Sequence, residues 1–225
     1  MVLPDGRCDL ILRFNAEGDL PLDPISILIV GPSTSFHIAK LKPGLCFIGA
    51  RLRPGFLWHV LKINPSSLCN KAVIGEDAIK LQPALRNLVA PACTVSELID
   101  RLVQFVVQAA PKSKPNLVQL LIDTMHVSGG RLSVKELSLM HGVKSRTVHR
   151  LVVQETGLSP KMLNIILQFH RALRLLRDHQ LKPVEAAFEA GYSDQAHMTR
   201  SFQKLGGFTP ARLPDVVLVT LPMNV

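Results

Sequence analysis

The chain has 225 residues, of which 47% are hydrophobic and 19% are charged. This apolar content is enough for packed cores and excludes a disordered or low-complexity chain. Lys and Arg number 26 against 17 Asp and Glu, and the surplus is uneven. Residues 1–110 hold 11 basic and 9 acidic residues, whereas residues 111–225 hold 15 and 8, so the second half is the basic half.

The sequence contains no candidate membrane span and no secretory signal. Its longest apolar runs, such as Ile27–Val30, are far shorter than the roughly 20 residues that cross a bilayer. The first six residues lack a basic segment followed by an apolar stretch. We therefore expect a soluble cytoplasmic protein with no membrane partner.

The cysteines and histidines do not form a ligand pattern. The four cysteines are 38, 23 and 24 residues apart, at Cys8, Cys46, Cys69 and Cys93. Without a C-x-x-C pair, this spacing favours structural thiols over a zinc site or a redox couple. His37 and His59 also lack partners at ligand spacing. We expect neither a metal nor a cofactor.

Residues 1–55 show the period-two alternation that is typical of strands. Apolar residues at positions 10, 12 and 14 alternate with polar ones, and a second alternating run covers 46–53. Two more candidates, 25–30 and 35–41, lie between these runs and are separated by Gly- and Pro-containing turns. Four strands in so few residues favour a small sandwich or a partial barrel.

The pattern becomes helical after Gly55. A capping box at 94–97, with Thr94 and Glu97 as its members, predicts a helix to about Ala109. The sequence PKSKP at 111–115 ends this helix and favours a domain boundary, because it has prolines and lysines but no apolar residue. We therefore expect an α+β protein with a β-rich domain and flanking helices at 1–110, an all-helical domain at 111–214 and an apolar tail at 215–225.

The second half contains one helix–turn–helix pattern twice. In the first copy, the capping box 133–136 starts a short helix, and Ser145 caps a second helix that ends at Gly157. In the second copy, about 49 residues later, Pro183 starts the first helix and Ser193 caps the second. Each copy has a small residue followed four positions later by glycine, which lets two helices cross closely. These pairs are Ser138 with Gly142 and Ala187 with Gly191.

A long helix is predicted between the two copies. It starts at Ser159-Pro160 and runs to about Asp178, with one apolar stripe at the i, i+3, i+4, i+7 spacing. Nineteen residues would make a rod of roughly 28 Å. This length is compatible with two reading helices in successive major grooves, which are about 34 Å apart.

Four segments of this half closely resemble the AraC/XylS family of transcription regulators: 155–160 (ETGLSP), 171–176 (RALRLL), 190–195 (AGYSDQ) and 208–210 (FTP). The resemblance covers about 131–213. It implies two helix-turn-helix units joined by a long helix, each inserting its second helix into the major groove of double-stranded DNA. PDG at 4–6 and GARLRPG at 49–55 resemble the N-terminal domain of a poorly characterised AraC-type subgroup, which usually has a longer segment before PDG.

The resemblance places the two reading helices at 145–155 and 194–204. Arg can pair with guanine, Gln with adenine, Ala and Thr with a thymine methyl, and Lys with phosphate. A solvated basic helix face is the alternative. His197 is expected to be buried or half-buried. We expect DNA contacts from Lys144, Ser145, Arg146, Thr147, His149, Arg150, Gln195, Ala196, Thr199, Arg200 and Lys204.

Two departures from the family pattern affect the second unit. Gly206 stands where the family usually has Phe, and Leu213-Pro214 stand where it has an aromatic residue followed by Arg. We therefore expect the second unit to be packed less firmly. The apolar tail at 216–221 would either cover this defect or fray.

The resemblance implies a transcription regulator, expected to be an activator and not an enzyme. Its partners would be double-stranded DNA and RNA polymerase, and it would be nucleoid-associated in the bacterial cytoplasm when bound to DNA. Residues 1–110 would sense a small-molecule effector of unidentified chemistry or mediate a homodimer.

Two alternatives remain. A degenerate family member could act through protein–protein interaction and not through DNA. A methyl-acceptor repair protein of the Ada type also joins an AraC-like domain to a four-cysteine module, but the clustered cysteine spacing that it needs is missing here.

Overall fold

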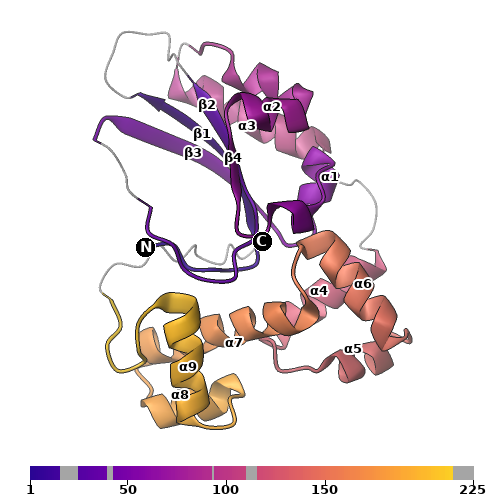
Figure 1. Cartoon of the computed structure of the whole chain (residues 1–225), viewed down its shortest axis with the longest axis vertical. Coiled ribbons are helices and arrows are strands. Elements are labelled where there is room, and N and C mark those ends of the chain that lie inside the picture. Colours follow the sequence, from indigo (N-terminus) through magenta and orange to yellow (C-terminus); the bar gives the residue numbers. More distant parts are fainter. Residues whose placement is uncertain (16–24, 40–42, 93, 110–115, 215–225) are drawn as a thin grey trace.

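The computed structural model describes residues 1–15, 25–39, 43–92, 94–109 and 116–214. A β-sheet with its own helices lies above a group of six helices, and the two parts meet along a broad junction (Figure 1). The protein is therefore α+β, as the sequence predicts. The expected boundary segment 111–115 and the apolar tail lie outside the described residues.

The sheet has four antiparallel strands in the order β3-β1-β2-β4. In β1, the side chains of Leu10, Leu12 and Phe14 alternate with more exposed ones, because successive side chains point to opposite faces of a strand. Leu10 lies opposite Ile29 of β2 and Ala50 of β3. The strands are β1 (Cys8–Asn15), β2 (Ser26–Val30), β3 (Leu45–Leu52) and β4 (Ala72–Ile74).

Two strand predictions are wrong. In its described part, the expected strand at 35–41 forms only a single bridge, between His37 and Val2. This segment pairs with the N-terminal residues and not with a strand of the sheet. The fourth strand is instead β4, whose three residues are too few to show an alternating pattern. Within the described residues, the strands form one open sheet and not a sandwich or barrel, and helices cover its apolar face.

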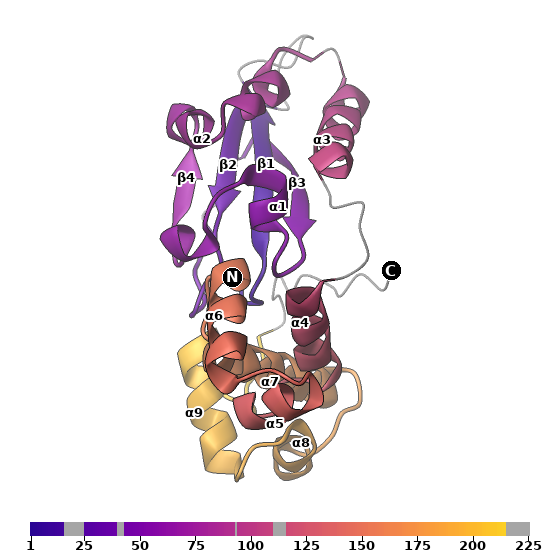
Figure 2. The same ribbon diagram turned by 90° about the vertical axis from the view of Figure 1, so that its right-hand side faces the viewer.

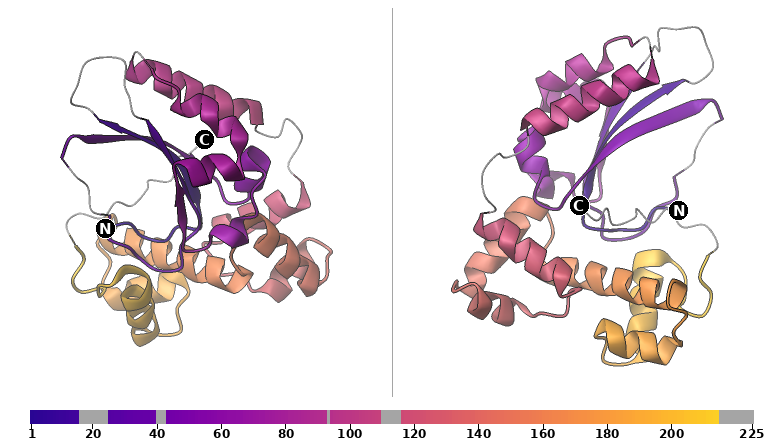
Figure 3. Two further views of the ribbon diagram at one scale, coloured as in Figure 1. Left: turned by 45° about the horizontal axis from the view of Figure 1, so that its top comes forward. Right: turned by 180° about the vertical axis from the view of Figure 1, so that it is seen from behind.

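Helices from residues 56–109 lie on one side of the sheet (Figure 3). Leu57, Leu61, Leu85 and Leu98 are buried with the inward side chains of the strands. Thr94 caps the last of these helices, accepting a hydrogen bond from the Glu97 amide at 3.1 Å. The helices are α1 (Leu57–Leu61), η1 (Pro65–Leu68), α2 (Glu76–Leu81), η2 (Pro83–Val89) and α3 (Val95–Ala109).

The remaining helices form the two predicted units and their connection (Figure 2). Ser133 and Glu136 make the expected reciprocal capping box, and Ser159 caps the long helix by accepting from the Met162 amide. Gly157 and Gly191 adopt the left-handed conformation that ends a helix. The helices are α4 (Leu117–Val127), α5 (Val134–Met140), α6 (Ser145–Thr156), α7 (Pro160–Arg177), α8 (Pro183–Ala190) and α9 (Gln195–Gly206).

Helix α7 belongs to both units, which the expectation of one apolar stripe did not foresee. Leu163 packs in the first core with side chains of α4, α5 and α6. Ile166, Phe169 and Leu173 pack in the second core with α8 and α9. Because α7 contributes to both cores, it holds the two units in a defined relation.

The N-terminal segment completes the second core. Leu3 is only 4% exposed and lies in the same cluster as Phe169 and Phe202, together with the half-buried Phe36 and Cys69. The two halves of the chain are therefore joined by apolar packing and not only by the connecting segment.

We predict that Leu3→Ala lowers the free energy of unfolding by about 2 kcal/mol, because a buried leucine leaves a cavity when it is truncated. Urea unfolding followed by circular dichroism measures this change. Leu139→Ala is the matched control, since Leu139 is 73% exposed. Equal stability of the two variants would contradict the placement of Leu3 in the core.

Candidate nucleic-acid interface

The first unit consists of α5, a short turn and α6. The turn passes through Gly142, whose φ of 65° is readily accessible only to glycine. Ser138 of α5 receives a hydrogen bond from the Ser145 hydroxyl at 3.3 Å, so the small residue lies where the two helices cross. Lys144, and not Ser145, is the N-cap residue of α6. The expected Ser145 cap is therefore wrong by one position.

The expected contacts of the first unit share one exposed face of α6. Val148 and Val152 turn inward and are buried. Thr147 is half-buried, and the remaining candidates are exposed: Lys144, Ser145, Arg146, His149 and Arg150. The structure thus places two arginines and a histidine together on the solvent side of the helix.

The second unit repeats this arrangement with α8 and α9. Asp194, and not Ser193, caps α9, because its carboxylate accepts a hydrogen bond from the His197 amide at 2.6 Å. This hydrogen bond lowers the pKa of Asp194, which keeps the carboxylate charged. Met198, Phe202 and Leu205 turn inward and are buried.

The expected contacts of α9 are also together on its outer face. Gln195, Ala196, Thr199 and Arg200 line a recess of about 540 Å³. Thr199 is half-buried, and its hydroxyl donates to the Gln195 carbonyl at 2.9 Å, whereas the other three and Lys204 are exposed. Arg150 and Arg200 are each the sixth residue of their helix, so they have equivalent positions in the two units.

The prediction for His197 is wrong. The side chain is exposed at the first turn of α9, where Nδ1 lies 3.2 Å from the Ser193 hydroxyl and the ring meets Tyr192 edge-on. The buried aromatic residue is Tyr192, whose hydroxyl donates to Ser201 at 3.2 Å. His197 therefore belongs to the surface beside the reading face.

The substitution at Gly206 does not leave a gap. A Cβ at this position would lie 2.5 Å from the ring of Phe208, so that ring occupies the space. Phe208 also packs against Phe169 and Phe202, with centroid distances of 6.2 and 5.8 Å. The second unit has a continuous aromatic core, contrary to the expectation of looser packing.

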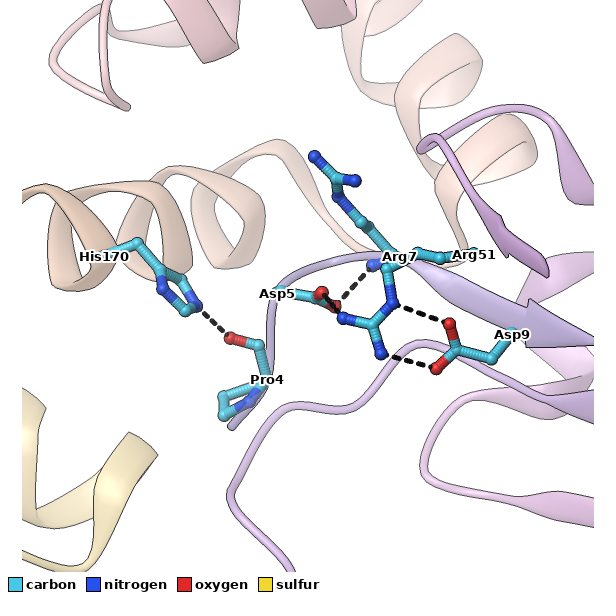
Figure 4. A network of polar contacts seen from close by, with 6 residues as sticks. All are labelled: Pro4, Asp5, Arg7, Asp9, Arg51 and His170. Atoms are coloured by element: carbon cyan, nitrogen blue, oxygen red, sulfur yellow. Dashed lines mark hydrogen bonds and ion pairs between the residues drawn. The ribbon is translucent and has the colours of Figure 1, made fainter. Parts of the chain in front are cut away.

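Described residues of the N-terminal half contact both units. The ring of His170 on α7 lies 2.7 Å from the carbonyl of Pro4, to which its Nε2–H donates (Figure 4). Arg51 pairs with Asp5 and Asp9, each at 2.7 Å, and so fixes the segment that carries Pro4. Burial lowers the pKa of His170, consistent with a neutral ring at this junction.

The end of α6 is held in the same way. The Ser66 hydroxyl donates to the Val153 carbonyl at 3.3 Å, and His59 lies 3.7 Å from the Glu155 carboxylate. A Cβ on Gly157 would lie 2.7 Å from the backbone of Pro65, so only glycine allows this contact. Burial raises the pKa of Glu155, and the nearby His59 partly offsets this effect.

A basic cavity lies between the two units and was not predicted. It has a volume of about 660 Å³, and four basic side chains line it: Arg131, Lys161, Arg200 and Lys204. Arg131 and Lys161 come from the α4–α5 turn and the start of α7. No motif in the sequence singles out these two residues, because only the packing of α7 against both units brings them to α9.

Within the described residues, no three His, Cys, Asp or Glu side chains come together as metal ligands. Cys8, Cys46 and Cys69 are free thiols, and Cys93 lies outside the described residues. Burial raises the pKa of Cys8 far above its usual value, as expected for an unreactive thiol. None of the described helices is both long and apolar enough to span a bilayer.

Comparison with known proteins supports the interpretation of both halves. Residues 137–214 match a family described as a helix-turn-helix domain, and residues 1–74 match a domain of unknown function (DUF6597). Over 65 residues, the chain is 32% identical to the HTH-type transcriptional activator RhaS of Escherichia coli O9:H4 (strain HS). Residues 137–214 are therefore a helix-turn-helix domain of the type found in the AraC/XylS family.

The matched segment covers 29% of this chain and 23% of RhaS, so the chain spans about a quarter of the length of these curated relatives. Two solved structures are also similar. The C-terminal domain of AraT from Geobacillus stearothermophilus has 23% identity and a TM-score of 0.41, covering 45% of this chain and 84% of that domain. ToxT from Vibrio cholerae O395 has 10% identity and a TM-score of 0.46, and the match covers 93% of this chain and 88% of the ToxT chain.

Proposed function

We propose that the protein is a sequence-specific transcription regulator that reads double-stranded DNA with α6 and α9 in successive major grooves. The observation that carries this proposal is the repetition of one exposed, basic reading face in two units that share α7. Arg150 and Arg200 are suited to bidentate contacts with guanine, and Gln195 is suited to adenine. The similarity to RhaS, a transcriptional activator, favours activation. We propose RNA polymerase as the protein partner of this step.

The junction between the halves supports a role in modulation for residues 1–110. These residues contact α6 through Pro65 and Ser66, and they contact α7 through Pro4. Phe36 reaches the end of α9, where a Cβ on Gly207 would lie 2.5 Å from its ring. An effector or a second copy that changes this packing would change the relation between the two reading helices, and with it the population that can bind DNA.

Selection of duplexes from a genomic library by the purified protein tests the reading mechanism. We expect a site with two half-elements about one helical turn apart. Arg150→Ala should relax one half and Arg200→Ala the other, each at a cost of about 1–3 kcal/mol. Arg86→Ala in η2 is the control, since it removes an arginine from the sheet domain.

The selection also separates the alternatives. If the wild type enriches no site, or if both variants bind like the wild type, α6 and α9 do not read DNA. The degenerate family member that acts through protein partners would then be favoured. A wild-type preference of about 10³ or more over random DNA would exclude that alternative.

A further inference from the structure

We infer that the basic cavity between the two units binds a backbone phosphate of the DNA strand that runs from one half-site to the other, with Arg131 and Lys161 as additional phosphate ligands. This inference rests on the proposed function. It adds two contacts that lie outside both reading helices.

The lining of the cavity is positively charged. None of its lining residues is acidic, whereas Arg131, Lys161, Arg200 and Lys204 bring four positive charges to one depression of about 660 Å³. Within the described part of the chain, none of the four forms an ion pair. Four cations gathered in this way repel one another unless an anion joins them.

The local hydrogen bonds leave these charges available to an anion. Arg131 uses Nε to donate to the Ser128 carbonyl at 3.0 Å, which fixes the start of its guanidinium group at the cavity wall. The nearby charge of Arg200 contributes to lowering the pKa of Asp194. The Asp194 carboxylate accepts a hydrogen bond from the His197 amide as the cap of α9 and forms no ion pair with Arg200. The positive side chains of the cavity are therefore available to a negative ligand.

The position of the cavity identifies DNA as the source of that ligand. Arg200 lines both the cavity and the recess on the reading face of α9. A helix in the major groove has a sugar–phosphate strand on each side, so a strand beside α9 passes the cavity. Lys161 lies at the start of α7, the helix that joins the two units. A phosphate between the half-sites is thus the group that these side chains would meet.

The volume alone would also admit a free anion, because small-molecule sites have volumes of about 300–1,000 Å³. The DNA backbone and a free anion would both offer a phosphate group to the cavity. The experiment therefore compares duplex DNA with inorganic phosphate.

The main test is the salt dependence of binding to the selected duplex and to a random duplex of equal length. We expect Lys161→Ala to weaken binding roughly tenfold on both, because a phosphate contact is independent of sequence. In Lys161→Ala, the plot of log affinity against log salt should become less steep by about 1. Lys161→Arg should have the wild-type slope. Lys80→Ala removes one exposed charge from α2 and should leave the slope unchanged. Arg131→Ala should act as Lys161→Ala does.

A second arm locates the phosphate. Single phosphates between the half-sites are replaced by neutral methylphosphonates, and affinity is measured for the wild type and for Lys161→Ala. At one position, the replacement should weaken the wild type and leave the variant unaffected. Unchanged unfolding temperatures of the variants establish that the loss does not come from misfolding.

Other results would overturn the inference or the proposed function separately. If the wild type prefers its selected site but Lys161→Ala has the wild-type slope, the phosphate contact is wrong and the reading mechanism stands. If the wild type has no preference, but Lys161→Ala lowers the slope on random DNA, the contact stands and specific reading fails. If inorganic phosphate stabilises the wild type but not Lys161→Ala, and DNA slopes are equal, the cavity binds a small anion.

Discussion

Phe169→Ala should lower the free energy of unfolding by about 4 kcal/mol, because large-to-small changes at buried aromatic positions cost roughly 3–5 kcal/mol. Phe169 is fully buried on α7, and its ring meets Phe202 of α9 edge-on at 4.8 Å. Since a domain of this size is stable by only about 5–15 kcal/mol, the second unit should become the first part to unfold. Urea unfolding and hydrogen exchange would measure this change.

An exposed phenylalanine, Phe188, provides the control for Phe169→Ala. Phe188 on α8 is 80% exposed, so Phe188→Ala should change stability by less than about 0.5 kcal/mol. In the duplex selection, Phe169→Ala should weaken the half-site of α9 more than that of α6, whose core lies elsewhere on α7. Equal losses in the two phenylalanine variants would show that the aromatic cluster does not hold the second unit.

Acid should destabilise the protein through His126, beginning as the pH falls below about 6.5. Burial lowers the pKa of His126 to about 4, and the positive charge of Arg7 acts in the same direction. The Nε2 atom of His126 is buried without a hydrogen-bond partner among the described residues. The ring is neutral in the folded and unfolded chains above pH 6.5. Below that value, the unfolded chain takes up a proton that the folded chain does not bind until about pH 4.

The stabilisation from neutral His126 is thus present at pH 7 and lost on acidification. With a folded pKa of about 4, the loss is about 2 kcal/mol at pH 5 and about 3 kcal/mol at pH 4. Burial lowers the pKa of His170 as well, so His170 acts in the same direction. Asp9 and Glu155 oppose the trend, because burial raises the pKa of each carboxyl.

Urea unfolding of the wild type and His126→Gln between pH 7 and 4 isolates this contribution. The difference between the two proteins should shrink by about 2 kcal/mol from pH 7 to pH 5. His179→Gln is the control, because His179 is exposed just after α7. A His126 variant with the same acid dependence as the wild type would contradict the burial of a neutral ring.

The sequence predicted the helical half well because its signals are local. Capping boxes, glycine turns and the 3.6-residue period act within one or two turns of chain, so the short-range pattern of Ser133-Glu136 or Gly157 specifies a helix end without help from distant residues. The alternation in β1 and β3 was equally local. The strand expected at 35–41 failed because the pairing partner of its described part is the N-terminus and not the sheet.

The tertiary structure decided what depends on contacts between distant segments. It packed Phe208 against Phe169 of α7 and placed Leu3 in the core of the second unit. It also brought Arg131 and Lys161 to α9, which no spacing in the sequence could indicate. The resemblance to the AraC/XylS family indicated the outward faces of α6 and α9, and the candidate side chains on them are exposed or half-buried. Which residues from elsewhere meet those helices depends on packing, and packing is a property of the whole fold.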